Sequence, residues 1–318
     1  MLKYGIYGYG NLGRALELAV RESGEEVTAV FTRRDPEGVR SEHGSPICPA
    51  AWAAEYAEEI DILFLATGSA RDVPREAPVL AGHFHLVDSY DCHEKIPLHV
   101  AAVDAEARRT GHVALLSAGW DPGLFSVFRT VCAAIAPNGV RTTLYGKGVS
   151  QGHSEAVRRL AGVRYAKVYT LPTAEGRLLA YRGTRPPTGV SLHRRVCYTV
   201  AEAGEEERIR AEIVSMPHYF LGTPTEVIFL SEEEYLSAHA GNAHRGSSVT
   251  VFQTGHHREN REEISMSVSL DSNPEFTAAV MLAYGRAALR LAAEGQVGAF
   301  LPTDIPPRLL LPEAWDCL

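Results

Sequence analysis

Two aspartates follow apolar runs of the sequence, at positions where a sheet enzyme would do its chemistry. Asp91 stands in "DSYDCHE" after the run "FHLV", and Asp121 stands in "SAGWDPG" after the run "HVALL". In an open parallel sheet, ligands bind outside the carboxyl ends of the strands, so the residues just after each strand line the site. Two carboxylates there suit a substrate that carries a cation such as an ammonium group. Taken alone, each aspartate is more typical of a turn or a helix cap.

A glycine-rich turn near the start of the chain predicts a dinucleotide site. "GYGNLG" follows the run "KYGIY" and places Gly8, Gly10 and Gly13 in G-x-G-x-x-G spacing. The first glycine allows the tight turn, the second lets the backbone approach a pyrophosphate, and the third lets the helix pack on the strand. The helix N-terminus then offers free N–H groups and a partial positive charge. The alternative is a glycine turn needed only for packing.

The end of the second apolar run indicates which dinucleotide binds. An NAD site usually has Asp or Glu there to hold the ribose 2′-OH. In "FTRRD" that place falls to Thr32, and Arg33 and Arg34 follow. An arginine and a phosphate about 4 Å apart attract each other by roughly 4 kcal/mol at an effective dielectric of 20, before desolvation is subtracted. The sequence therefore favours NADP over NAD, the alternative being a solvated pair of arginines.

The elements that must position these residues alternate between apolar runs and helical segments. The runs are "KYGIYGYG", "EVTAVFT", "DILFLAT", "FHLVDS" and "HVALLSA". Runs this apolar, joined by helix-length crossovers, predict a doubly wound, Rossmann-type α/β domain with a parallel sheet covered on both faces. We expect this domain to span residues 1–137.

The sequence pattern changes after Asn138 to longer segments in which apolar and polar residues alternate. They include "VRYAKVYTL", "LHRRVCYTVAE", "TEVIFLS", "SSVTVFQTG" and "EISMSVSLD". The alternation predicts an α+β substrate domain over residues 138–272, with a mostly antiparallel sheet. Residues 273–318 are expected to form a C-terminal helix and tail that pack back on the first domain. Asn273 is its expected N-cap, Pro274 its first helical residue and Gly295 its stop.

The composition limits the classes of partner. The chain has 318 residues, 45% of them hydrophobic, and a formal net charge of −8, which disfavours nucleic acid or an anionic membrane as partner. The five cysteines form no CxxC pair, so reduced thiols are expected. The start of the chain lacks the pattern of a secretory signal, and no segment approaches the roughly 18 to 20 apolar residues that span a bilayer. We therefore expect a soluble, cytoplasmic protein.

Several segments together resemble the meso-diaminopimelate D-dehydrogenase family, from about residue 4 to about residue 300. They are "GYGNLGR", "TRR", "LFLATGSARDVP", "DSYDCHEKIP", "SAGWDPGLFS", "GVSQGHSEAVRR", "YTLP", "MPHYF" and "LDSNPEFTA". "SAGWDPG" and "SQGHS" are specific to that family. The resemblance implies an NADP-dependent homodimer that dimerises through the second domain. It also implies reversible oxidative deamination of the D-centre of meso-2,6-diaminopimelate, in lysine and cell-wall precursor metabolism.

The resemblance also implies site residues. The cofactor contacts it implies fall on Gly8, Tyr9, Gly10, Asn11, Leu12, Gly13, Thr32, Arg33, Arg34, Ala66, Thr67, Gly68, Ser69, Ser89, Tyr90, Asp91, Ala118, Gly119, Trp120, Asp121 and Pro122. The substrate contacts fall on Asp91, Trp120, Asp121, Tyr145, Gln151, Gly152, Thr170, Arg195, His244 and Asn273. Asp91 and Asp121 are the catalytic candidates: both would hold the amine of the D-centre, and which one takes the proton stays open. Arg195 suits a carboxylate, which it can bind through a bidentate fork.

Blander interpretations exist for several of these residues. Arg195 is also typical of an exposed strand, and Gln151 with Ser154 is also typical of helix capping. His244 stands near His239, yet no carboxylate or cysteine stands at ligand spacing, so no metal site is expected.

The sequence also departs from the family pattern. Tyr145 stands where Trp is expected, Arg245 where a small residue is expected, and Lys95 where an acid is expected. The first two leave a broad-specificity NADP-dependent D-amino acid dehydrogenase open as an alternative. More distant alternatives are a reductase of dihydrodipicolinate type and a non-catalytic NADP-binding regulatory or scaffold protein.

Overall fold

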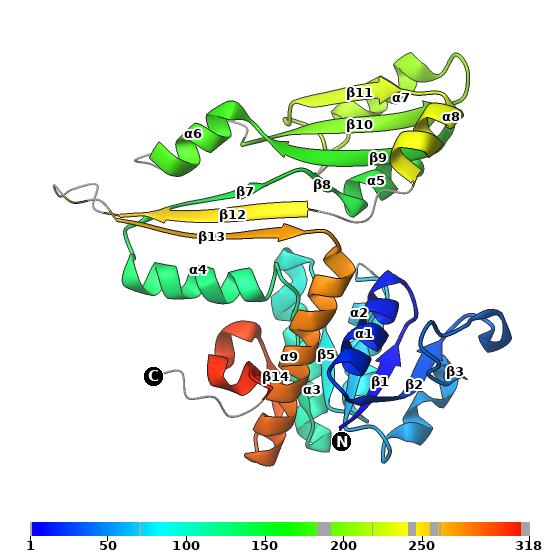
Figure 1. Cartoon of the computed structure of the whole chain (residues 1–318), viewed down its shortest axis with the longest axis vertical. Coiled ribbons are helices and arrows are strands. Elements are labelled where there is room, and N and C mark those ends of the chain that lie inside the picture. The colour runs from blue at the N-terminus through cyan, green and yellow to red at the C-terminus, as the bar shows by residue number, and fades with distance from the viewer. Residues whose placement is uncertain are drawn as a thin grey trace. The chain divides into compact units, whose positions relative to one another are not determined.

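The apolar runs of the N-terminal region form the centre of a seven-stranded, all-parallel sheet in the order β14-β6-β5-β4-β1-β2-β3 (Figure 1). The computed structural model describes residues 2–69, 71–182, 192–217, 219–240, 246–254, 260 and 262–312. The strands of this sheet are β1 (Lys3–Tyr7), β2 (Glu26–Thr32), β3 (Ile47–Pro49), β4 (Ile62–Leu65), β5 (Leu86–Asp88), β6 (Val113–Leu115) and β14 (Gly298–Phe300). They belong to the first of two compact units, residues 1–130 with 274–318; residues 131–273 form the second.

Helices cover both faces of the parallel sheet. They are α1 (Asn11–Glu22), α2 (Val73–Ala81), α3 (Ile96–Thr110) and α9 (Asn273–Ala293). Alternate residues of β4 separate the two faces: Ile62 and Phe64 pack with residues of α1 and α9, whereas Leu63 and Leu65 pack with residues of α2 and α3. All four are almost fully buried. Helices on both faces of a parallel sheet confirm the predicted doubly wound fold.

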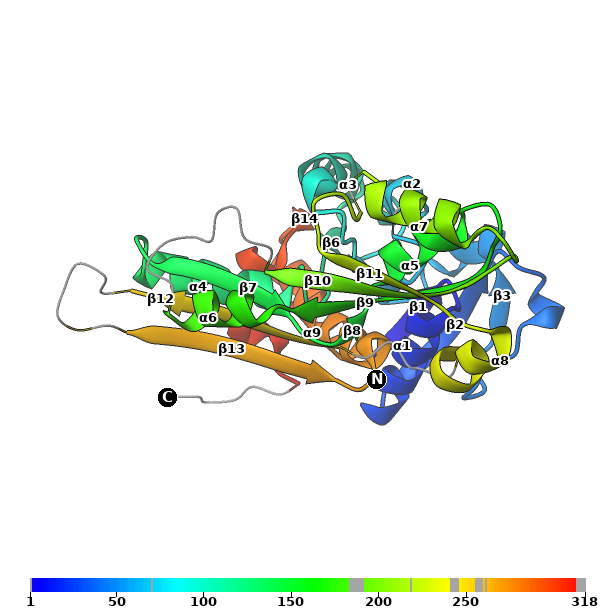
Figure 2. The same cartoon turned by 90° about the horizontal axis from the view of Figure 1, so that it is seen from above.

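The second unit contains two sheets. One has the order β11-β10-β9-β8 and the other β13-β12-β7, and β10–β11 is the one parallel pair among the described strands of this unit. Figure 2 shows β12 beside β13 along its length. The strands are β7 (Val140–Tyr145), β8 (Gly148–Val149), β9 (Val163–Pro172), β10 (His193–Ala201), β11 (Thr225–Phe229), β12 (Gly246–Gln253) and β13 (Glu263–Leu270). The mostly antiparallel pairing confirms the predicted α+β character.

The helices of the second unit pack mainly on the four-stranded sheet. Val157 of α5 and Ile209 of α7 share a buried cluster with Val168 of β9 and Cys197 of β10. The helices are α5 (Gln151–Arg158), α6 (Ala174–Arg182), α7 (Glu206–Ser215) and α8 (Glu232–Tyr235), while α4 (Leu124–Ile135) continues from the first unit into the second. Across the described part of the chain, no helix is both long and apolar enough to cross a membrane.

Candidate active site

The glycine turn after β1 has the geometry that its spacing predicts. Gly8 has a φ of +105°, and a Cβ there would lie 2.8 Å from the carbonyl oxygen of Ala66. A Cβ on Gly13 would lie 2.1 Å from the carbonyl oxygen of Gly8, whereas a Cβ on Gly10 would meet nothing within 4 Å. Helix α1 begins directly after Gly10 with no side-chain cap and no acid in its first turn. Its N-terminal N–H groups are therefore oriented for an anion.

A cavity of 290 Å³ lies at the carboxyl ends of β1, β2 and β4. Most of its lining residues are predicted cofactor contacts, and they come from three separate segments of the chain. The lining residues are Tyr7, Gly8, Tyr9, Gly10, Phe31, Thr32, Arg33, Arg34, Ala66, Thr67 and Gly68. The structure thus gathers these contacts around one space at the sheet edge where ligands of such folds bind.

The two arginines at this cavity differ in their partners. Arg33 binds Asp72 through two contacts of 2.8 and 2.7 Å and approaches Glu76 at 3.2 Å. Hydrogen bonding to Asp72 raises the pKa of Arg33, and the same bond lowers the pKa of Asp72. Arg34 donates to the carbonyl of Tyr9 at 2.6 Å and has no acidic partner among the described residues. Arg34 therefore carries the uncompensated positive charge at this cavity.

The turn after β6 closes tightly on itself. Gly123 has a φ of +128°, and a Cβ there would lie 1.7 Å from the carbonyl oxygen of Gly119. The Trp120 ring meets Phe125 edge to face, with 5.7 Å between the ring centroids. The backbone N–H of Phe125 also donates to the Trp120 carbonyl at 2.9 Å. The two glycines thus permit the close approach that fixes Trp120 and Asp121 in the turn.

The two candidate catalytic aspartates have different surroundings. Asp121 is held by Arg129 of α4 through two contacts, one of them 3.2 Å between Nη1 and Oδ2, and its side chain is 3% exposed. Asp91 is exposed, and its carboxylate accepts a 2.5 Å hydrogen bond from the hydroxyl of Ser69. The backbone N–H of Asp91 donates to the hydroxyl oxygen of Ser69. Arg129 is not among the predicted site residues, and its one signal in the sequence is a charge inside the otherwise uncharged segment "LFSVFRTVC".

In the second unit, Arg195 lies directly opposite Thr170 in the pairing of β10 with β9 and donates to its hydroxyl. The Nε atom of Arg195 is buried and has no hydrogen-bond partner among the described residues. Arg195 also forms no ion pair with a described acid. Burial lowers its pKa, because desolvation disfavours the charged form. A buried polar group without a partner is costly, so a hydrogen-bond acceptor such as a carboxylate is favoured at this guanidinium.

Two histidines that are not among the predicted site residues lie near this guanidinium. His153, in "SQGHS", donates from Nε2 to the carbonyl of Tyr219 at 2.9 Å, and its Nδ1 accepts from the Ser150 hydroxyl at 2.7 Å. Burial and then the charge of Arg195 lower the pKa of His153 to about 4. The same two causes, in the same order, lower the pKa of His193. Neutral imidazoles therefore lie near Arg195, where protonated ones would repel it.

The other predicted substrate residues belong to the second unit. Tyr145 ends β7, is 39% exposed, and donates its backbone N–H to Nε2 of His193 at 2.8 Å. Gln151 and Gly152 begin α5, though the Gln151 side chain is not described. Asn273 is the first residue of α9. His244 and the adjacent Arg245 fall outside the described residues.

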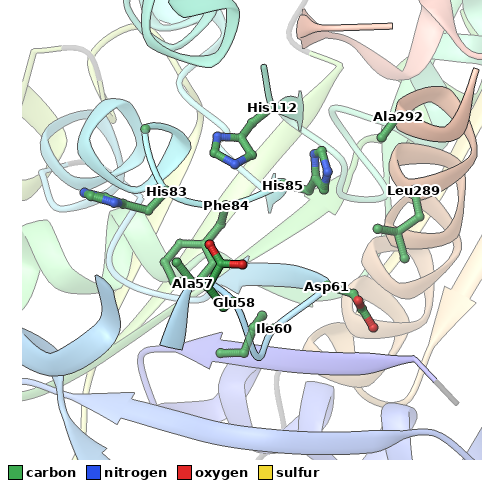
Figure 3. Close-up of a pocket in the computed structure, with 11 residues that line it drawn as sticks. Ala57, Glu58, Ile60, Asp61, His83, Phe84, His85, His112, Leu289 and Ala292 are labelled. Carbon is green, nitrogen blue, oxygen red and sulfur yellow. The ribbon is translucent and has the colours of Figure 1, made fainter. Parts of the chain in front are cut away.

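A second cavity of the first unit, with a volume of 560 Å³, lies away from the predicted site residues (Figure 3). Residues that precede strands line it, such as Ile60, His85 and His112, so it occupies the opposite edge of the parallel sheet. The rings of His85 and His112 meet edge to face at 5.3 Å, and burial lowers the pKa of both. Because ligands of this fold class bind at the carboxyl edge, we exclude this cavity from the candidate site.

Comparison with known proteins identifies the family. Residues 119–272 match the family described as "Diaminopimelic acid dehydrogenase C-terminal domain". A meso-diaminopimelate D-dehydrogenase of Acetivibrio thermocellus is 43% identical over 98% of this chain and 95% of the relative. The chain belongs to the meso-diaminopimelate D-dehydrogenase family. This membership confirms the resemblance that the motifs indicated and makes the chain a dehydrogenase.

Solved structures of the family confirm the fold. The Corynebacterium glutamicum DAP dehydrogenase in complex with DAP superposes with a TM-score of 0.90 at 38% identity, covering 98% of this chain and 96% of the other. An engineered D-amino acid dehydrogenase bound to NADP+ gives a TM-score of 0.86 at 36% identity, with the same coverage of both chains.

Proposed function

We propose that this chain catalyses the reversible, NADP-dependent oxidative deamination of the D-centre of meso-2,6-diaminopimelate, which yields L-2-amino-6-oxopimelate, ammonia and NADPH. The observation that carries the substrate assignment is Arg195, a partly buried side chain whose buried Nε has no partner among the described residues. A dicarboxylic substrate supplies the missing anion, because a carboxylate accepts two parallel hydrogen bonds from a guanidinium. The other carboxylate and the amine at the D-centre then remain for the reacting end.

The residues of the first unit fit the cofactor. The turn from Gly8 to Gly13 leaves open space at Gly10 for a pyrophosphate, and Arg34 offers an uncompensated charge to a 2′-phosphate. When bound, NADP accepts the hydride that leaves the Cα of the D-centre. The chain contributes orientation, since hydride transfer needs the reacting atoms about 3 to 3.5 Å apart.

The proposed proton chemistry belongs to Asp91 and Asp121. Both carboxylates hold the amine, and one of the two removes a proton from it, directly or through a water. Loss of a hydride from Cα and a proton from nitrogen leaves an imine, to which water adds before ammonia departs. Arg129 keeps the Asp121 carboxylate in one orientation, while Asp91 is oriented by the Ser69 hydroxyl. The ring of Trp120, in the same turn as Asp121, would form one wall of the site.

Stereoisomers of the substrate test the proposal. NADP reduction is measured with the separate meso, LL and DD isomers of diaminopimelate, and we expect turnover of the meso isomer and none of the LL isomer. No turnover of meso-diaminopimelate by folded protein would refute the proposal. Ammonia-independent NADPH oxidation would instead favour the reductase of dihydrodipicolinate type, and NADP binding without any turnover would favour a regulatory protein.

A second candidate is a broad-specificity D-amino acid dehydrogenase on the same scaffold. Tyr145, 39% exposed where the family pattern has Trp, favours it because a half-exposed phenol walls a pocket less completely. Turnover of D-alanine or D-lysine at a rate close to that of meso-diaminopimelate would establish this alternative.

We also propose a homodimer, which the family resemblance implies, and a cytoplasmic location, which the composition of the sequence favours. Light scattering coupled to size-exclusion chromatography measures the mass directly, and a mass of one chain would contradict the dimer.

A further inference from the structure

A buried carboxylate that is not among the predicted site residues joins the two loops that carry the candidate catalytic aspartates. Asp88 is the last residue of β5 and has no exposed surface. Its Oδ1 accepts the backbone N–H groups of Tyr90, at 3.0 Å, and Ser117, at 2.8 Å. Its backbone carbonyl accepts the N–H of Ala118 at 2.8 Å. One residue thus fixes the backbone just before Asp91 and just before the turn that contains Asp121.

The other oxygen of this carboxylate is held from the opposite side. Nε2 of His99, in α3, lies 2.6 Å from Oδ2 of Asp88, and both side chains are at most 1% exposed. Because the carboxylate oxygens already accept two N–H groups, Nε2 is the donor to Oδ2. Nδ1 of His99 has no partner among the described residues, and the ring packs at a tilt of 40° against the ring of Tyr90, with 4.5 Å between the centroids. His99 therefore orients the carboxylate and supports the first loop by packing.

The second loop needs such an anchor. Ser117 has a φ of 57°, and it is the one described residue other than glycine with a positive φ. A non-glycine residue adopts this conformation only where its surroundings hold it there. The hydrogen bond from its N–H to Asp88 is internal to the first unit and buried, so water does not compete for it.

We propose that Asp88, oriented by His99, is a positioning residue for the dehydrogenase reaction: it sets the two loops so that Asp91 and Asp121 meet the same amine. This inference rests on the proposed function. A shift of about 1 Å in either loop is enough to slow a hydride transfer by roughly a hundredfold. Neither side chain touches the solvent, so their effect on the reaction passes through the loops.

Three variants and a control test the inference. Asp88→Ala removes the acceptor, His99→Met keeps the bulk but removes the donor, and His99→Gln restores an N–H near the place of Nε2. We expect kcat to fall about a hundredfold in Asp88→Ala and about tenfold in His99→Met, and to stay within about threefold in His99→Gln. The control is Asp104→Ala, a carboxylate of α3 that accepts the N–H of Ala299 at 2.8 Å but contacts neither loop.

The deciding readout is the primary isotope effect on kcat with substrate deuterated at the Cα of the D-centre. Mispositioned loops slow the hydride step and raise the isotope effect, whereas loss of folded protein lowers kcat and leaves the effect unchanged. The control is expected to lower the melting temperature without changing the isotope effect.

Separate outcomes overturn the inference and the proposed function. If Asp88→Ala does not fold, the two His99 variants decide. An unchanged isotope effect in His99→Met, or equal impairment of His99→Met and His99→Gln, overturns the inference alone. A wild-type chain that turns over no D-amino acid overturns the proposed function, and this inference falls with it.

Discussion

Replacing Arg195 by Leu is expected to stabilise the fold and to abolish efficient use of the dicarboxylate. The reason for both effects is the buried Nε, which has no partner among the described residues. In the free protein its burial costs free energy, and in the substrate complex the same group meets its anion. Opposite changes in stability and activity are therefore expected from one substitution.

The two magnitudes follow from the contacts of Arg195. An unsatisfied buried polar group costs about 1 to 3 kcal/mol, while the hydrogen bond to Thr170 that the substitution removes contributes about 1 kcal/mol. The net gain is about 1 kcal/mol, which raises the melting temperature by about 2 to 4 °C for domains of this size. Removing one partner of a buried charge pair costs about 2 to 5 kcal/mol. The value of kcat/KM for meso-diaminopimelate should then fall by a factor of about 30 or more.

The matched control is Arg194→Leu. Arg194 is the neighbour of Arg195 on β10, faces the other side of the sheet, and forms an exposed ion pair of 3.2 Å with Glu226. Exposed pairs contribute little, so we expect less than a twofold change in kcat/KM and a change in melting temperature of about 1 °C or less. Thermal unfolding and initial rates with meso-diaminopimelate measure both effects. A destabilised Arg195→Leu variant that retains wild-type kcat/KM would refute the reasoning.

Three further predictions separate the roles of single groups. Arg34→Ala should raise the KM for NADP about tenfold or more and leave the KM for NAD unchanged. The rise should exceed that in Arg33→Ala, because acids already pair with Arg33. Initial rates with both cofactors measure the two KM values, and equal changes for NADP and NAD would contradict the prediction. The folded-state pKa of His153 is depressed to about 4, so folding favours its neutral form. The contribution of this neutral imidazole to the free energy of unfolding is present above pH 6.5 and is lost as the pH falls from 6.5 towards 4. The full pKa shift corresponds to about 3 kcal/mol of unfolding free energy, and partial exposure reduces the expected loss to about 1 kcal/mol. Urea unfolding at pH 7 and pH 4.5 should show that His153→Gln loses this pH dependence. Gly13→Ala, whose Cβ would meet a carbonyl at 2.1 Å, should lower the melting temperature by several degrees, whereas Gly10→Ala should not, and a stable Gly13→Ala would count against the packing role.

Strands of both units could be predicted, those of the first from continuous apolar runs and those of the second from alternation. Ile62–Leu65 forms β4 and is buried at every position, so a continuous apolar run identifies it without its partners. The short strands β3 and β14 were missed, because three residues carry no periodicity and a proline ends β3. Their pairing depends on neighbours that are distant in the sequence. Strand β7 was missed for a different reason: it directly follows the Asn-Gly turn that was taken as a domain boundary.

The candidate site divides in the same way. The glycine turn is a local feature, since the roles of Gly8 and Gly13 follow from spacing within a single strand-turn-helix unit. The contacts that hold the loops of the catalytic candidates are not local. The proton-bearing nitrogen of His99 faces Asp88 only because α3 packs on the end of β5, and no sequence pattern marks that approach. Contacts of this kind depend on the tertiary structure and cannot be predicted from local sequence patterns.

The distribution of paired and unpaired arginines connects the site to the overall charge. The chain has a formal net charge of −8, yet the proposed ligands, NADP and a dicarboxylate, are both anions. Long-range repulsion therefore opposes binding, and affinity must come from short-range contacts that solvent does not screen. Arg33 and Arg129 already bind acids of the protein, so their role is to hold loops and carboxylates in place. Arg34 of the first unit and Arg195 of the second form no ion pair with a described acid, so both remain available to the anions that the proposed function brings.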